Sequence, residues 1–177
     1  MKSSPILENL GSWAATLQFK DIPPRVVEKV RLQILSSITA AAFSPWHQPS
    51  QAVLKARKSE GNALILATLD RVAPIDAAFV NAAFAMSLDF DDYLLTGHTG
   101  YSAVLVPLAY AQTLEEVVVA ATAANEIMGR LSTNSFIGPL NGQMSSYIHN
   151  VGAAVSLGKI LELSSNQMVH AMAIALY

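Results

Sequence analysis

The sequence has no cysteine among its 177 residues. Disulfide frameworks, iron–sulfur clusters and thiolate zinc sites all need cysteine sulfur, so the chain forms none of them. Charged residues are also scarce, at 14% of the chain, where a typical soluble domain has roughly 25%. Hydrophobic residues make up 52% and the mean hydropathy is +0.36. We therefore expect surplus apolar surface that another subunit or domain covers.

Positive charge is not in excess. The chain has 11 Lys and Arg residues against 13 Asp and Glu, a net charge of −2, and no basic patch that would neutralise phosphates, so nucleic acid is not an expected partner. A membrane-spanning helix needs about 20 consecutive apolar residues. The nearest approach, residues 101–114, is interrupted by Pro107. The first residues lack the apolar stretch of a signal peptide. We expect a cytoplasmic protein without a membrane segment.

Helical periodicity covers most of the chain. Apolar residues recur at three- and four-residue spacings, which predicts helices over 6–17, 21–42, 50–57, from 74 onward, 113–130, 151–163 and 168–177. Asp21 is the expected N-cap of the second helix. Ser164 and Gln167 have the spacing of a capping box, as do Thr113 and Glu116. Residues 62–73 are predicted to form a hairpin. The fold class is therefore all-α, a multi-helix domain with at most one small β-hairpin.

The densest cluster of reactive side chains lies between residues 89 and 101. Asp89, Asp91 and Asp92 directly follow a predicted apolar helix, and two glycines flank His98 and Thr99. If the helix continues, Asp89 and Asp92 share one face while Asp91 points elsewhere. Negative charges at a helix C-terminus are electrostatically unfavourable, so three of them there need an explanation.

Three interpretations of this cluster remain open. Asp89 and His98 can form an acid–base pair, because histidine titrates near neutrality. Alternatively, the cluster is a solvated acidic helix end with a turn histidine beside it. A metal site would suit Asp and His ligands and would make the chain a metal-dependent hydrolase. Since no metal-binding spacing such as HExxH is present, we predict no metal.

Other ionisable residues are interpreted structurally. Lys159, in the middle of a predicted helix, is expected to be a surface lysine whose stem covers apolar surface. Arg130 is expected to complement the dipole of the helix that it ends. His170, on the last apolar helix, is expected to be a core or interface histidine.

The run Leu88-Asp89-Phe90-Asp91-Asp92, followed by Gly97-His98-Thr99, is the most distinctive motif of the chain. Further stretches accompany it in order, at residues 10–15, 22–27, 78–81, 125–130, 151–154 and 158–161. Together these stretches resemble the MmgE/PrpD family, which includes 2-methylcitrate dehydratase, cis-aconitate decarboxylase and iminodisuccinate epimerase. The resemblance covers essentially the whole chain and only the N-terminal part of the family's longer sequence.

The resemblance implies a large all-helical domain that forms a dimer and a smaller α/β lid domain. It also implies an active site between them that needs no metal or organic cofactor. The family's catalytic Asp and His fall on Asp89 and His98. We expect Asp92, Thr99 and His149 to contact the substrate, His149 because it lies in a loop-like approach to a helix N-terminus that could face an anion. The family often has His-Pro-Ser where this chain has His98-Thr99-Gly100.

A substrate with two or three carboxylates needs cationic partners, because burying an unpaired charge costs on the order of several kcal/mol. Residues 89–101 offer three negative charges and at most one positive charge, on His98. The family's later Lys-Pro-(small)-His stretch and its lid have no counterpart in this sequence. We therefore expect a single helical domain over residues 1–177 that a second polypeptide completes, as a homo- or hetero-oligomer joined through helical surfaces.

The leading functional prediction is a lyase component acting on a small di- or tricarboxylate, first of all 2-methylcitrate by dehydration. Cis-aconitate decarboxylase-like and epimerase-like activities are alternatives, because all three reactions move a proton next to a carboxylate. A non-catalytic helical scaffold or dimerisation module, or a truncated fragment of such an enzyme, is the alternative from a different class.

Overall fold

The computed structural model describes residues 5–56, 59–90, 92–94, 97–134 and 144–177. The α-helices are α1 (Pro5–Thr16), α2 (Pro24–Phe43), α3 (Gln48–Ala56), α4 (Pro74–Met86), α5 (Val106–Leu108), α6 (Leu114–Asn134), α7 (Met144–Ile160) and α8 (Ser165–Leu176). A 3₁₀ turn, η1 (Phe19–Asp21), and a π-helical turn, η2 (Tyr101–Leu105), lie between them. The strands β1 (Ala63–Leu64) and β2 (Arg71–Val72) pair as an antiparallel hairpin. The prediction of an all-α fold with one small hairpin is confirmed.

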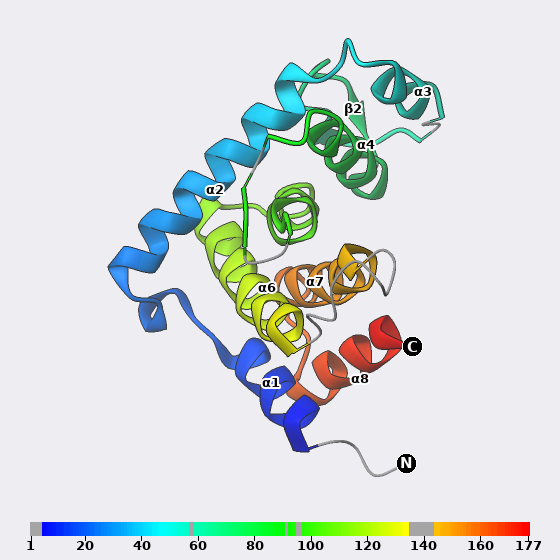
Figure 1. Cartoon of the computed structure of the whole chain (residues 1–177). Helices are drawn as coiled ribbons and strands as arrows, with labels where there is room; N and C mark the ends of the chain where they lie inside the picture. The colour runs from blue at the N-terminus through cyan, green and yellow to red at the C-terminus, as the bar shows by residue number, and fades with distance from the viewer. Residues whose placement is uncertain (1–4, 57–58, 91, 95–96, 135–143) are drawn as a thin grey trace.

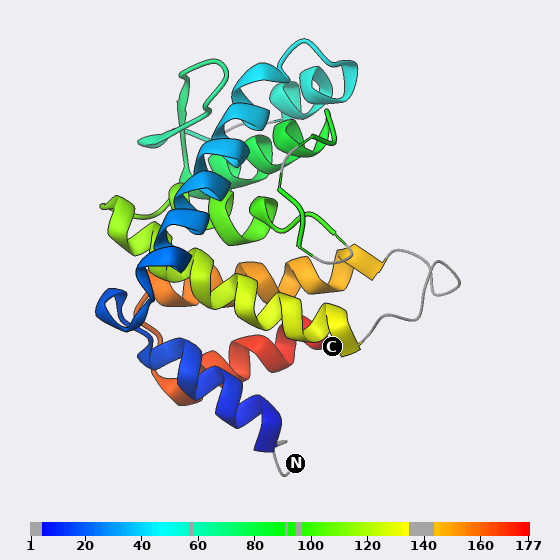
Figure 2. The same ribbon diagram turned by 60° about the vertical axis from the view of Figure 1, so that its left-hand side comes forward.

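The helices stack along the length of the molecule. In both views α6 and α7 lie side by side in the middle, and α1 packs against α8 at the end that carries the N-terminus (Figures 1 and 2). The long helix α2 runs from near α1 along one side to the opposite end, where α3, α4 and the hairpin gather. Between α4 and η2, Asp92 and Thr99 contact Gln33 of α2, and Leu94 lies near Gly129 of α6.

Helix starts follow the predicted capping in some places and depart from it in others. Ser164 accepts a hydrogen bond from the Gln167 N–H, and the Gln167 side chain accepts one from the Ser164 N–H, so that capping box is confirmed. The prediction that Asp21 caps α2 is wrong. Pro23 occupies the cap position, while the Asp21 carboxylate accepts from the Gln18 N–H at 3.0 Å.

Helix α7 begins earlier than predicted, at Met144 rather than Val151. Ile148, Val151 and Val155 are buried and recur at helical spacing. This buried stripe packs against α6, and tertiary packing of this kind overrides the low helix propensity of the Gly- and Ser-rich sequence before it.

Lys159 has a different role from the predicted surface lysine. Its half-buried ammonium group donates to the carbonyl oxygens of Ala15 at 2.8 Å and Leu17 at 2.9 Å. These carbonyls lie at the end of α1, where the last C=O groups of a helix have no partner within the helix. Burial lowers the pKa of Lys159, while the nearby Glu162 opposes that shift. Lys159 therefore caps α1 and joins it to α7.

Asn81 joins α4 to the hairpin. Its buried side chain accepts from the Leu66 N–H at 2.9 Å and donates to the Leu64 carbonyl at 2.9 Å. One side chain thus satisfies two backbone groups at the edge of a two-stranded sheet that is too small to be stable by itself. Within the described ranges, no helix combines the length and the apolar character needed to cross a bilayer.

Candidate active site

The segment after α4 leaves helical geometry before it reaches the aspartates. Helix α4 ends at Met86, and Asp89 has a φ of 53°, in the left-handed region that is rare for non-glycine residues. The helix does not continue to the aspartates, so the condition under which Asp89 and Asp92 would share one helix face is not met. Asp91 lies outside the described residues.

The two residues expected to exchange protons lie together. His98 Nε2 is 3.0 Å from Asp89 Oδ1. The His98 side chain is 17% exposed and that of Asp89 is 81% exposed, so the carboxylate is the outer member of the pair. The imidazole packs between two phenol rings, edge-on to Tyr93 at a centroid distance of 4.7 Å and stacked on Tyr101 at 5.9 Å. The left-handed backbone conformation of Asp89 directs its carboxylate toward His98, nine positions later in the sequence.

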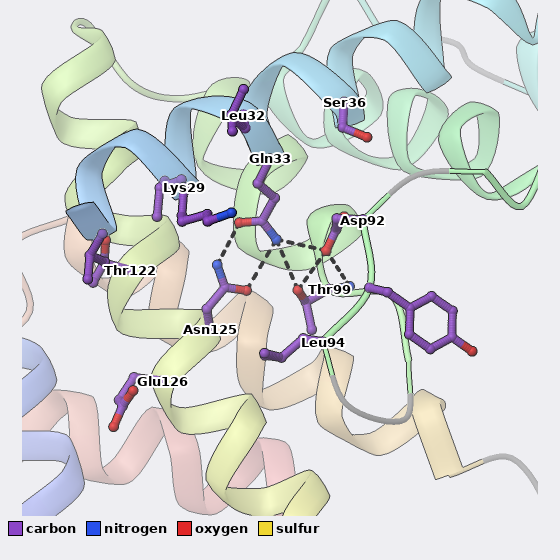
Figure 3. A pocket seen from close by; sticks show the side chains of 13 residues that line it. Lys29, Leu32, Gln33, Ser36, Asp92, Leu94, Thr99, Thr122, Asn125 and Glu126 are labelled. Carbon is purple, nitrogen blue, oxygen red and sulfur yellow. Dashed lines mark hydrogen bonds between the residues drawn. The ribbon is translucent and has the colours of Figure 1, made fainter.

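Asp92 and Thr99 also lie together, and they bond to each other (Figure 3). Asp92 Oδ2 accepts from the Thr99 N–H at 3.1 Å and from the Thr99 hydroxyl at 2.9 Å. Asp92 Oδ1 accepts from the Gly100 N–H at 2.9 Å. Every contact described for the Asp92 carboxylate is to the protein, and the expected role of Asp92 and Thr99 in substrate binding stays a prediction.

Two residues that sequence analysis missed complete this group. Gln33 on α2 donates to Asp92 Oδ2 at 2.8 Å and to the Thr99 hydroxyl at 3.0 Å. Asn125 on α6 donates to the Gln33 carbonyl oxygen at 2.6 Å. We call Gln33, Asp92, Thr99 and Asn125 the Asp92 cluster, which Figure 3 shows as one connected set of hydrogen bonds.

The Asp92 cluster forms part of the wall of an open cavity of about 520 Å³. Polar side chains at helical spacing line it from two sides, with Lys29, Gln33 and Ser36 on α2 facing Thr122, Asn125 and Glu126 on α6. Polar residues at positions i, i+4 and i+7 of one helix are the signal that could have identified the α2 stripe. Lys29 contributes a positive charge to this cavity wall. Sequence analysis did not predict that it lies near the aspartates.

His149 lies beyond Tyr101, on α7. Its ring centroid is 5.4 Å from that of Tyr101, and its Nδ1 is hydrogen-bonded to the Ser102 hydroxyl at 2.9 Å. Because α7 begins at Met144, His149 lies inside the helix, and the expectation of a loop leading to a helix N-terminus is wrong. Burial lowers the pKa of His149, the nearby Asp92 raises it, and His98 lowers it further. Its role in substrate binding stays a prediction.

Arg130 and His170 differ from their predicted positions. Arg130 forms an ion pair with Glu126 one turn earlier on α6, which continues to Asn134, so Arg130 does not end its helix. His170 is exposed on α8 in the single chain, so a core position is wrong, and an interface position stays a prediction. Among the described residues, no group of three or more His, Asp or Glu side chains has an arrangement that could hold a metal ion.

The pair can act as a proton carrier. With a neutral imidazole and an ionised carboxylate it can accept a proton, and with an imidazolium it can donate one, so a single pair supports both directions of general acid–base chemistry. The two phenol rings shield the imidazole from water on two sides, while Asp89 stays accessible. No described contact of Asp89 or Asp92 comes from a Lys or Arg side chain.

Comparison with known proteins gives a consistent result. The family model described as the MmgE/PrpD N-terminal domain matches residues 8–177. A cis-aconitate decarboxylase of Aspergillus terreus is 25% identical over 189 aligned residues, which cover 97% of this chain and 39% of that protein. A cis-aconitate decarboxylase-like protein, oryM, of Aspergillus oryzae is 24% identical over 109 residues, which cover 60% of this chain and 23% of the relative. The chain thus spans 39% of the length of the longer-matching relative.

Proposed function

Because the chain belongs to the MmgE/PrpD family, we propose that it is the proton-transferring helical part of a lyase for small di- and tricarboxylates. The observation that carries this proposal is the 3.0 Å contact between His98 and Asp89. This contact brings together two ionisable groups that sequence analysis had selected from their residue types and order. We assign Asp89 and His98 the catalytic role, because a histidine within hydrogen-bond distance of an accessible carboxylate can take up and release a proton.

The reaction that we propose first is decarboxylation. The bond between a carbon and the departing CO₂ breaks, its electron pair stays on the carbon, and that carbon takes a proton from the Asp89–His98 pair. The decarboxylase names of the relatives support this choice. Dehydration of 2-methylcitrate is the second candidate. There the pair removes a proton from the carbon next to a carboxylate, and a hydroxyl group leaves as water after protonation. In an epimerisation the proton is removed and returned to the other face.

The charge balance supports a requirement for additional protein. A tricarboxylate that approaches Asp89 meets a negative charge, and desolvating its own charges without cations costs on the order of several kcal/mol per ion. Lys29 lies on the wall of the neighbouring cavity, and one lysine does not balance two or three carboxylates. We propose that cationic groups from outside the 177 residues complete the site, in keeping with relatives of which this chain spans 39% or less.

An assay of reconstituted protein tests the proposal. The purified chain is mixed with the protein encoded by adjoining DNA, and CO₂ release from cis-aconitate and water loss from 2-methylcitrate are measured. We expect no turnover from this chain alone and turnover from the mixture. His98→Gln is expected to lower kcat by about 10²- to 10⁴-fold, while His170→Gln, an exposed control on α8, leaves it unchanged. Full activity of His98→Gln contradicts the catalytic assignment, and activity of the isolated chain contradicts the requirement for additional protein.

A second candidate function, a helical scaffold or dimerisation module, is favoured by the exposed apolar side chains. Leu32, Leu35 and Phe43 lie at helical spacing on α2 and are 59–71% exposed, and Phe79 on α4 is 59% exposed. Helices that are apolar on more than one face pack against neighbours on more than one side. Native mass spectrometry distinguishes a monomer from an assembly of copies or of distinct chains. Leu35→Lys should dissociate an assembly formed through α2, whereas the control Arg25→Glu on the same helix should not.

A further inference from the structure

Asp92 lies beside the proposed catalytic pair, yet protein donors occupy the acceptor positions of its carboxylate. The Asp92 carboxylate accepts from the side chain of Gln33, from both donors of Thr99 and from the Gly100 N–H. A carboxylate has about four acceptor positions. These contacts use them, so little capacity remains for a ligand, and its negative charge opposes an anionic substrate.

The hydrogen bond from the Thr99 N–H bears directly on His98. That N–H belongs to the peptide unit that joins His98 to Thr99, so Asp92 fixes the backbone immediately after the histidine. The peptide unit before the histidine is fixed as well, because the Gly97 carbonyl accepts from the Leu94 N–H at 2.8 Å. His98 is thus anchored on both sides, and its ring is directed between Tyr93 and Tyr101.

The position of Asp92 is itself closely determined. A Cβ atom at Gly100 would lie 2.3 Å from Asp92 Oδ1 and 2.2 Å from Ser37 Oγ, so only glycine allows this approach. Gln33 and Asn125 connect the carboxylate to α2 and α6, two of the longest helices. Side chains locked by packing and by a second set of hydrogen bonds hold a reactive group more accurately than a loop does.

We propose that Asp92 is a positioning residue that sets the orientation of the His98 imidazole through the Thr99 and Gly100 backbone, a role that rests on the proposed function of His98. Asp92 acts through the histidine and not on the substrate. Replacing one carboxylate oxygen by an NH₂ group, as in Asp92→Asn, turns an acceptor toward backbone donors into a donor, and the anchor after His98 is lost.

The histidine NMR spectrum tests this inference without any assay of activity. The chain has four histidines, so the ring signals of the 177-residue chain can be assigned with single His→Gln variants. Asp92→Asn should move the His98 signals toward those of the exposed His47, because the imidazole loses its ring contacts with Tyr93 and Tyr101. Thr99→Val, which keeps its N–H but loses the hydroxyl, should move them less.

Glu126→Gln is the matched control, because it removes a carboxylate charge from the same cavity wall without touching the Asp92 cluster. It should leave the His98 signals unchanged. A folded Asp92→Asn variant with unchanged His98 signals overturns the inference. If Asp92→Asn does not fold, Thr99→Val decides, because it removes one of the donors to Asp92: a small shift of the His98 signals supports the inference, and no shift overturns it.

Kinetics of the active assembly separate positioning from substrate binding. Displacement of a catalytic group by about 1 Å costs up to about 100-fold in rate, so Asp92→Asn should lower kcat by about 10- to 100-fold with little change in KM. A raised KM with unchanged kcat would assign Asp92 to substrate binding and overturn the inference. If no lyase activity is found at all, the proposed function fails, whereas the NMR result still decides whether Asp92 orients His98.

Discussion

Two glycines in the central helix pair provide a sharp test of the packing, because alanine should have opposite effects at the two positions. An alanine Cβ at Gly152 of α7 would lie 2.3 Å from Met128 Sδ and 2.7 Å from Ser102 Oγ. At Gly129 of α6 the nearest atom would be Leu94 Cδ2 at 3.4 Å, an ordinary contact. Alanine is favoured over glycine by about 1 kcal/mol inside a helix. Gly129→Ala should therefore stabilise the protein by up to that amount.

At Gly152 the same gain is opposed by overpacking, which costs about 1–3 kcal/mol. Met128 is fully buried, and the Ser102 hydroxyl is bonded to His149, so neither atom can move toward solvent. After the helix propensity gain of about 1 kcal/mol is subtracted, we expect Gly152→Ala to be destabilising by up to about 2 kcal/mol.

Thermal unfolding followed by circular dichroism measures both effects. For a protein of this size, 1 kcal/mol shifts Tm by about 2–4 °C. Gly129→Ala should raise Tm by up to about 4 °C, and Gly152→Ala should lower it by up to about 8 °C. If Gly152→Ala is as stable as Gly129→Ala, the close packing of α6 against α7 is refuted.

Three further predictions concern single buried polar groups. Lys159→Met should lower the free energy of unfolding by about 1–3 kcal/mol in urea titrations, because two carbonyls at the end of α1 lose their donor; the exposed control Lys55→Met should change it little. Asn81→Leu should cost about 2–4 kcal/mol, since two backbone groups of the hairpin lose their partner, whereas Asn150→Leu at an exposed site should not. Burial lowers the pKa of His149 from its ordinary value of 6.5, so the folded state favours the neutral ring and the unfolded chain binds the proton first as pH falls. This contribution to stability is complete above about pH 6.5 and is lost as pH falls through the lowered pKa, so His149→Gln should flatten the decline of stability with acid.

The residues near one another in the sequence were the ones that sequence analysis could place. Asp89 and His98 are nine positions apart, and an acid–base pair was one of the three interpretations that their residue types left open. The helix boundaries of α2, α3 and α8 followed from periodicity and from Pro and Ser signals, and they agree with the structure within a few residues. Helix ends and pairs of reactive residues depend on a few neighbouring positions, so the sequence predicts them.

Contacts between distant segments could not be placed in the same way. Gln33 is 59 positions from Asp92 and 92 positions from Asn125, and amide side chains on a helix surface usually indicate only a solvated face. Lys159 reaches the Ala15 carbonyl across 144 positions. From its sequence alone, a lysine in a helix is predicted to be a surface residue. Only the fold shows that the unpaired carbonyls at the end of another helix lie within hydrogen-bond distance of it.

The excess of carboxylates after α4 has a physical explanation in the structure. A negative charge at a helix C-terminus faces unpaired carbonyls and is unfavourable, whereas at a helix N-terminus it faces unpaired N–H groups and is favourable. Asp92 lies near the C-terminus of α4 in sequence, yet in space it accepts from the Thr99 and Gly100 N–H groups that open the next helical segment. The left-handed backbone of Asp89 directs its side chain away from the carbonyls at the end of α4, and its carboxylate contacts His98. Two aspartates three positions apart thus have different surroundings: Asp92 is held by fixed backbone donors, as its proposed positioning role requires, while Asp89 remains accessible beside His98, as its proposed role in proton exchange requires.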